Sequence, residues 1–429
     1  MKAFKLPDHF LLGSATAATQ IEGGDKNNSW YNWCEKGHIK DRSTCLRAND
    51  HWNRYKEDIA LMEKLNHKVY RMGLEWSRIE PQEGRFDDEA IAHYRDEITL
   101  LLEKGIKPLV TLHHFTNPLW LERMGGFEDK SVVWYFERYV KYVVERLGDL
   151  VSEYITINEP NVYATLGYYF GVWPPGVKSI KRLLKVYRNM ALCHITAYKL
   201  IHKIRKDNDF PGKTMVGVAN HVRIFDPYNK YNPLDILAAK IMDYLFQGSL
   251  TKSMATGFLR PPVGLGAPKG GGRYFDFIGI NYYTRDAIRF KGFRNEVMPG
   301  TPRNDLNWEI YPRGLYRICK KYYRLFTAPI WITENGTCDG EDRFRSRFIY
   351  DHLYEISKLC KEGIPVERYY HWTLMDNFEW VEGESARFGL YHVDYDTQVR
   401  TLRKSGRFYG EICKRLEVTD DMIDKYLKD

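Results

Sequence analysis

Short apolar runs alternate with longer helical patterns along the whole chain, and this alternation limits its fold more than any other feature. Strand-like runs are followed by stretches with helical spacing, up to a final helix at 403–416. The predicted strands are 10–15, 69–74, 107–112, 153–157, 215–219, 275–280, 330–333 and 366–374. The predicted helices between them are 58–65, 88–104, 132–147, 180–206, 234–246, 314–325 and 344–360.

Eight strands that alternate with helices predict a parallel sheet closed into a (β/α)8 barrel of the TIM type. An open, doubly wound sheet is the alternative, but such sheets usually carry a glycine-rich phosphate-binding turn after the first strand. The length of 429 residues is room for nearly three domains of ~150 residues, yet no linker divides the chain. We therefore predict one α/β barrel domain over residues 1–429.

Charge and apolar runs exclude several classes of protein. The formal net charge is only +8, and lysine and arginine are spread along the chain without a nucleic-acid motif. The longest uncharged run, 160–177, contains three prolines and three glycines and does not form a membrane helix. The seven cysteines form no CxxC pair, and the first residues do not resemble a signal peptide. We expect a cytoplasmic protein that binds neither nucleic acid nor membranes.

Polar and aromatic side chains follow the predicted strands at the end where barrels of this kind place their chemistry. They recur after the first, third, fourth, sixth, seventh and eighth runs, and one lies within the second. These residues are Gln20, Arg71, His113, His114, Asn158, Glu159, Asn281, Tyr283, Glu334, Trp372, Glu379 and Trp380. We expect them to meet at one pocket.

Two glutamates in this set, Glu159 and Glu334, each follow directly on an apolar run. Each alone could be a buried ion-pair partner. A carboxylate pair without a metal or cofactor motif indicates glycosidic bond hydrolysis, and nearby aromatic rings suit the faces of sugar rings. A metal centre is the weaker alternative, because the adjacent His113 and His114 point to opposite faces of a strand. We therefore predict no metal and no cofactor.

Seven motifs that lie in order along essentially the whole chain carry a family resemblance. They are FLLGSATAATQIEG, VYRMGLEWSRIEP, TLHHFTNP, ITINEPN, FIGINYYT, PIWITENG and HWTLMDNFEWVEGESARFGLYHVDY. At these motifs the sequence resembles glycoside hydrolase family 1, the β-glucosidase and β-galactosidase family. The third motif departs from many members, because Phe115 stands where they have tryptophan.

The resemblance implies a retaining, exo-acting β-glycosidase that acts on terminal β-D-glucosyl and β-D-galactosyl or related residues. Glu334 is then the nucleophile that forms a covalent glycosyl-enzyme, and Glu159 is the general acid and base. Glu334 must stay ionised, with Arg71 and Tyr283 as its family-matched partners. Glu159 must hold its proton near neutral pH, which burial and the nearby Glu334 charge favour.

The resemblance also assigns the sugar-binding residues. By similarity, the sugar hydroxyls are held by Gln20, His114, Asn158, Glu379 and Trp380, with Trp372 as the stacking floor, Phe388 as a wall, and Asn281 and Tyr283 on the nucleophile side. A Glu379 carboxylate repels phosphate, so we expect an unphosphorylated small-molecule β-glycoside or oligosaccharide as substrate. A transglycosylase with the same residues, or a non-catalytic sugar-binding barrel, stays open. So do the preferred sugar and the oligomeric state.

Overall fold

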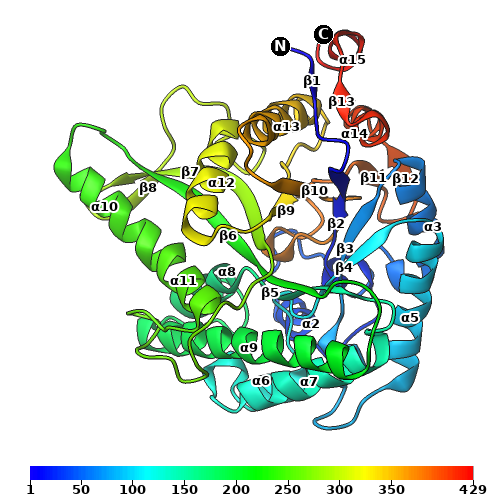
Figure 1. Cartoon of the computed structure of the whole chain (residues 1–429), viewed down its shortest axis with the longest axis vertical. Helices are drawn as coiled ribbons and strands as arrows, with labels where there is room; N and C mark the ends of the chain where they lie inside the picture. Colours follow the sequence, from blue (N-terminus) through cyan, green and yellow to red (C-terminus); the bar gives the residue numbers. More distant parts are fainter. Residues whose placement is uncertain (429) are drawn as a thin grey trace.

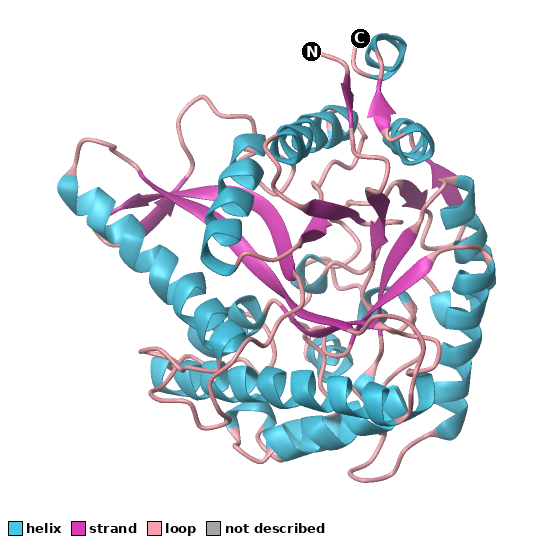
Figure 2. Cartoon of the chain, in the orientation of Figure 1, coloured by secondary structure: helices cyan, strands magenta, loops and turns pink. Residues whose placement is uncertain are grey.

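The computed structural model describes residues 1–428. Within them, eight parallel strands form one closed barrel, in which β6 pairs with β7 to complete the ring (Figures 1 and 2). The barrel strands are β2 (Leu11–Ala15), β3 (Val69–Gly73), β4 (Lys107–Thr111), β5 (Glu153–Asn158), β6 (Met215–Pro227), β7 (Ile278–Arg289), β9 (Ile330–Asn335) and β10 (Val366–Trp372). The predicted (β/α)8 barrel is confirmed.

Helices surround the strands, as the ring of ribbons in Figure 2 shows. The longer ones are α3 (His51–Lys64), α5 (Asp88–Glu103), α7 (Val132–Leu147), α9 (Ile180–Asp207), α10 (Pro233–Asp243), α11 (Ser249–Thr256), α12 (Pro312–Phe326), α13 (Arg345–Lys361) and α14 (Lys404–Arg415). Short helical segments in the connections are α1 (Ala18–Ile21), α2 (Ser29–Glu35), α4 (Trp76–Ile79), α6 (Leu119–Arg123), η1 (Gly126–Glu128), α8 (Pro160–Ala164), η2 (Thr165–Phe170), η3 (Tyr244–Gly248) and η4 (Trp380–Glu382), and α15 (Asp420–Tyr426) is the last element.

Helix α5 illustrates why these segments are helical. The Asp87 side chain accepts hydrogen bonds from the backbone N–H groups of Glu89 and Ala90, which caps the helix N-terminus. Ile91, Tyr94, Ile98 and Leu101 recur at helical spacing and are all buried. The helix therefore starts at its cap and lays one apolar stripe on the barrel.

Small strands lie outside the barrel. The strands β1 (Phe4–Lys5) and β13 (Glu417–Val418) pair antiparallel, which brings the two ends of the chain together at the top of Figure 1. The strands β11 (Tyr391–Val393) and β12 (Arg400–Leu402) pair with each other, and β8 (Arg294–Glu296) extends the edge of β7. In residues 1–428, no helix is long and apolar enough to cross a membrane. The cytoplasmic location stays a prediction.

The fifth and sixth predicted strands have wrong boundaries. The fifth, predicted as 215–219, continues to Pro227, and the sixth, predicted as 275–280, starts at Ile278 and continues to Arg289. The extensions pair with each other beyond the barrel, with a shift of register between Val222 and Ile224. Helix α10 covers them through a small separate core of Ala238, Ala239 and Ile288. This second core explains why pairing continues after the barrel ends.

Candidate active site

A cavity of about 130 Å³ lies at the carboxyl ends of the barrel strands. Eight of the sequence-predicted site residues line it: His114, Glu159, Tyr283, Glu334, Trp372, Glu379, Trp380 and Phe388. Gln20, Arg71, Asn158 and Asn281 are buried and reach these lining residues through hydrogen bonds. The strands of a parallel barrel end on one face, so residues far apart in the sequence meet here.

The Glu334 carboxyl, near the end of β9, accepts a hydrogen bond on each oxygen. Arg71 Nη1, from the barrel interior, lies 2.5 Å from Oε1, and the Tyr283 hydroxyl lies 2.5 Å from Oε2. Burial and the neighbouring Glu159 charge raise the pKa of Glu334 to about 7, against the lowering effect of Arg71 and Tyr283. Glu334 is therefore poised to lose or hold its charge near neutral pH.

The Glu159 carboxyl stands at the start of α8, on a residue whose φ of 40° is left-handed. A non-glycine residue in this region is strained, and such residues gather at functional sites. Its Oε1 lies 2.9 Å from His221 Nδ1 and accepts from Asn281 Nδ2 at 2.9 Å. Burial acts to raise the pKa of Glu159, but His221, Asn281 and the Arg71 charge outweigh it and lower the pKa.

This direction is opposite to the expectation that Glu159 holds its proton more tightly than usual. The physical reason is His221, which the sequence analysis did not include. Two carboxyls that interact this closely titrate as a pair rather than singly. The site therefore contains one pair with one readily exchanged proton near neutral pH.

Two asparagines connect the carboxyls. Asn158 Oδ1 accepts from Arg71 Nη2 at 2.7 Å and from Asn281 Nδ2 at 3.0 Å, and Asn158 Nδ2 donates to His114 Nε2 at 2.9 Å. Asn281 is itself oriented by the Thr333 hydroxyl, which donates to its Oδ1 at 2.6 Å. Burial and the Arg71 charge lower the pKa of His114 well below its usual value, so its ring is neutral. The network fixes both amides and both carboxyls in one arrangement.

Glu379 is a third carboxyl in the lining of the cavity. Gln20 Nε2 donates to Glu379 Oε2 at 3.2 Å and to the Phe378 carbonyl at 2.9 Å. Burial and the Glu334 charge raise the pKa of Glu379 to about 8. Burial therefore works against the Glu379 charge on which the argument about phosphate rests. An unphosphorylated substrate stays a prediction.

Aromatic rings form the walls. Trp380 stacks with His114 at 5.8 Å between ring centroids, and Trp372 lies 6.0 Å from the same ring. Phe115, which has a left-handed backbone, packs edge-on against Trp380 at 5.2 Å. Rigid rings beside polar groups suit a ligand with apolar faces and hydroxyl edges.

The cavity also contains residues that the sequence analysis missed: His221, Arg223, Val162, Leu166, Trp173 and Trp308. His221 had a signal, because Asn220-His221 follows the fifth apolar run directly. The rule that polar residues directly after a predicted strand belong to the site, applied to this strand as well, identifies His221. Trp173 and Trp308 lie in long connections, and no period or motif in the sequence brings them to this face.

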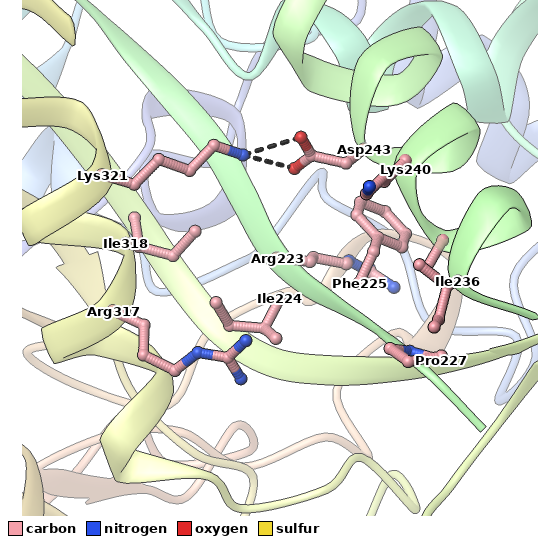
Figure 3. Close-up of a pocket in the computed structure, with 11 residues that line it drawn as sticks. Arg223, Ile224, Phe225, Pro227, Ile236, Lys240, Asp243, Arg317, Ile318 and Lys321 are labelled. Atoms are coloured by element: carbon pink, nitrogen blue, oxygen red, sulfur yellow. Dashed lines mark hydrogen bonds and ion pairs between the residues drawn. The ribbon is translucent and has the colours of Figure 1, made fainter. Parts of the chain in front are cut away.

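A second cavity of about 380 Å³ lies between β6, α10 and α12 (Figure 3). Its floor is apolar, with Ile224 and Phe225 from β6. Lys321 pairs with Asp243 across it, and Arg317 pairs with Asp226 at 2.7 Å. Arg223 lines both cavities. Among residues 1–428, no group of three or more His, Cys, Asp or Glu is placed to hold a metal ion.

The arrangement combines a carboxyl pair, a buried guanidinium and aromatic walls, which suits acid, base and nucleophile chemistry on a carbohydrate. Comparison with known proteins agrees. The family model of glycosyl hydrolase family 1 matches residues 2–259 and 272–418. Beta-glucosidase A of Thermotoga maritima is 34% identical over 98% of this chain and 100% of that protein. A beta-galactosidase of Pyrococcus woesei is 29% identical over 98% of this chain and 99% of its own.

A solved structure of a beta-glycosidase from Pyrococcus horikoshii has a TM-score of 0.89 and 36% sequence identity. The match covers 100% of this chain and 99% of that one. The match of the family model, together with relatives above 30% identity over nearly the full length, determines the family. The chain belongs to glycosyl hydrolase family 1 and is a glycoside hydrolase.

Proposed function

We propose that the protein is a retaining, exo-acting β-glycosidase that removes terminal β-D-glucosyl residues, and also β-D-galactosyl or related residues, from small β-glycosides. The observation that carries the proposal is the carboxyl pair of Glu159 and Glu334 in one aromatic-walled cavity, each with its own set of donors. The names of the related proteins, a beta-glucosidase and a beta-galactosidase, support both sugars.

In the first step, the Glu334 carboxylate attacks the anomeric carbon while the glycosidic C–O bond breaks. The proton on Glu159 passes to the departing oxygen, so a free alcohol leaves and a glycosyl ester of Glu334 remains. Only the form of the pair with its proton on Glu159 reacts. Arg71 and Tyr283 favour that form, because both donate to the Glu334 carboxylate.

In the second step, a water oxygen attacks the anomeric carbon and gives its proton to the Glu159 carboxylate. The ester bond breaks, the Glu334 carboxylate is restored, and the two inversions return the original β configuration. Esterified Glu334 carries no charge, so Glu159 ionises more easily in the intermediate than before it. His221 and Asn281 also favour the ionised form.

The remaining residues hold the sugar. We propose that hydroxyl groups bind to His114, Glu379 and Trp380, with Gln20 and Asn158 acting directly or by orienting their neighbours. Trp372 and Phe388 pack against the ring faces, since both line the cavity and are almost fully buried. The hydroxyls are thus bound at fixed polar positions between aromatic walls.

The test uses 4-nitrophenyl β-D-glucoside with the wild type, Glu334→Gly and Glu159→Ala. We expect hydrolysis by the wild type and losses of at least about 10³-fold in both variants, since each removes a reacting group. Glu128→Ala, which removes a carboxylate on η1 that pairs with Arg182 and does not line the cavity, is the control and is expected to retain activity. With an activated glucoside, azide should restore turnover of Glu159→Ala and yield the β-glucosyl azide. An α-azide, or normal turnover by Glu334→Gly, contradicts the proposal.

A further inference from the structure

The His221 ring lies between the Glu159 carboxyl and the Arg223 side chain, and both are within hydrogen-bonding distance of it. Its Nδ1 is 2.9 Å from Glu159 Oε1, and Arg223 Nε donates to its Nε2 at 2.8 Å. His221 is paired in register with Asn281 of β7, which also donates to Glu159 Oε1. Two neighbouring strands therefore present two nitrogen atoms to the same carboxyl oxygen.

The contact with Arg223 determines which ring nitrogen carries the proton. A guanidinium donates and does not accept, so His221 Nε2 must offer its lone pair to Arg223. In the neutral ring the proton then sits on Nδ1 and points at Glu159 Oε1. His221 is therefore a donor to Glu159, and Oε1 accepts from both His221 and Asn281.

Arg223 is held in place from several sides. Its Nη1 donates to Asp286 Oδ2 on β7 at 3.1 Å, and its backbone N–H donates to Gln247 Oε1 at 2.9 Å. The His221 ring lies parallel to Tyr283 at 6.0 Å and edge-on to Phe246 at 6.0 Å. The His221 carbonyl accepts from Asn161 at 2.9 Å. Ring, guanidinium and backbone are thus all fixed by neighbours.

We propose that His221 is a positioning residue for the proton-transferring carboxyl Glu159, and that Arg223 fixes the His221 tautomer that makes this possible. The inference rests on the proposed function. With Oε1 held by two donors, the proton that is exchanged with substrate and water belongs to Oε2. The donors stabilise the carboxylate form, which the second step requires of Glu159.

The charged and titratable groups around Glu159 come from four strands and from His114 and Glu379, which follow β4 and β10 and line the same cavity. Arg71 on β3 and Tyr283 on β7 flank the pair, Glu334 on β9 is the interacting carboxyl, and His221 and Arg223 lie on β6. Burial lowers the tendency of Glu159 to ionise, and His221 opposes this effect. Loss of the His221 donor should therefore raise the pKa of Glu159.

The perturbation is His221→Leu, which removes the donor but keeps an apolar side chain of similar bulk. On a dinitrophenyl β-glucoside the leaving group needs no proton, so the second step limits turnover. We expect kcat and KM to fall together by about 10- to 100-fold, because a hydrogen bond to the ionised base is lost. Azide needs no base and should restore kcat. On phenyl β-glucoside, the alkaline limb of kcat/KM should move up by about one pH unit.

His221→Asn is the conservative variant, because its amide N–H can take the place of Nδ1–H, and we expect most of the kinetic effect to disappear. Arg223→Leu leaves His221 present but frees its tautomer, so a smaller shift of the same kind is expected. His202→Ala is the matched control, since His202 forms a similar His–carboxylate pair with Asp276 far from the cavity.

The inference is overturned if His221→Leu lowers kcat/KM on both substrates by the same factor, leaves the alkaline limb in place and does not respond to azide. If His221→Leu does not fold, the same measurements on Arg223→Leu decide the question. Failure of the proposed function is distinguishable, because the wild type then releases neither phenol nor dinitrophenol. Failure of this inference alone leaves the wild type fully active.

Discussion

The hydroxyl of Tyr283 offers the sharpest test of how the carboxylate form of Glu334 is stabilised against burial. Tyr283→Phe removes one oxygen atom and leaves the ring that packs beside His221. Burial, with the Glu334 charge, raises the pKa of Tyr283 well above its usual value, so the phenol stays protonated and donates to Glu334 Oε2 at 2.5 Å. The Arg71 contact on Oε1 is untouched. The substitution therefore isolates one hydrogen bond to one carboxylate oxygen.

The magnitude follows from the charge of the acceptor. A hydrogen bond to a charged group contributes about 1.5–3 kcal/mol, and one pKa unit corresponds to about 1.4 kcal/mol. Loss of the Tyr283 donor should raise the pKa of Glu334, which burial already raises to about 7, by about one to two further units. Less carboxylate is then present at any pH below the new pKa.

The assay is the pH dependence of kcat/KM on an aryl β-glucoside, whose acidic limb reports ionisation of the carboxyl pair in the free enzyme. We expect that limb to move to higher pH in Tyr283→Phe, with the loss of rate greatest below pH 6. Tyr282→Phe is the control, because Tyr282 is on the same strand but donates to the Tyr311 carbonyl. An unmoved acidic limb with a uniform loss of rate at every pH refutes the reasoning.

Two further predictions concern stability. A histidine whose pKa is lowered by folding binds fewer protons in the folded than in the unfolded state, so the free energy of unfolding falls as the pH drops below 6.5. A carboxyl group whose pKa is raised by folding binds more protons in the folded state, so the free energy of unfolding falls as the pH rises toward 8. The buried histidines with lowered pKa values are His67, His113, His194 and His352, and the buried carboxyls with raised pKa values are Glu75, Glu334 and Glu379. We therefore expect the melting temperature, measured in a series of buffers, to be highest at about pH 6.5. A melting temperature that rises steadily to pH 9 contradicts this prediction. Glu153→Gln removes the carboxylate charge that pairs with the buried Arg368 and should cost about 3–5 kcal/mol in urea unfolding. Glu128→Gln, which removes the partner of the exposed Arg182, should cost under about 1 kcal/mol.

Much of the fold follows from the sequence because strand and helix periods differ and repeat eight times. A buried parallel strand such as β9 begins as a short, largely apolar run, and the carboxylate position follows from where that run ends. The family resemblance, rather than the run itself, named Tyr283 as a partner of Glu334, and the structure places the Tyr283 hydroxyl 2.5 Å from Glu334 Oε2. Their catalytic roles stay proposals.

The extension of β6 and the contacts of His221 could not be predicted, because they depend on pairing with a distant strand that no local sequence pattern indicates. Strand β6 was predicted to end at Ala219, because Asn220, His221 and Arg223 interrupt the apolar run. In the structure these polar residues continue the strand, since β7 supplies the ladder and Glu159 supplies the partner for His221. Tertiary contacts outweigh local preference at this place. The same contacts reverse the expected pKa direction of Glu159.

The register shift between Val222 and Ile224 has a consequence for changes in chain length. Strand side chains alternate between faces, so one added or deleted residue turns every later side chain to the other face. His221 and Arg223 lie just before and within the shift, on the strand that completes the barrel. Substitutions along this stretch alter one contact at a time, whereas a single-residue insertion or deletion between Ala219 and Arg223 misplaces the contacts of both residues at once. Variation among descendants of this sequence should therefore conserve the length of this stretch, even where individual residues along it change.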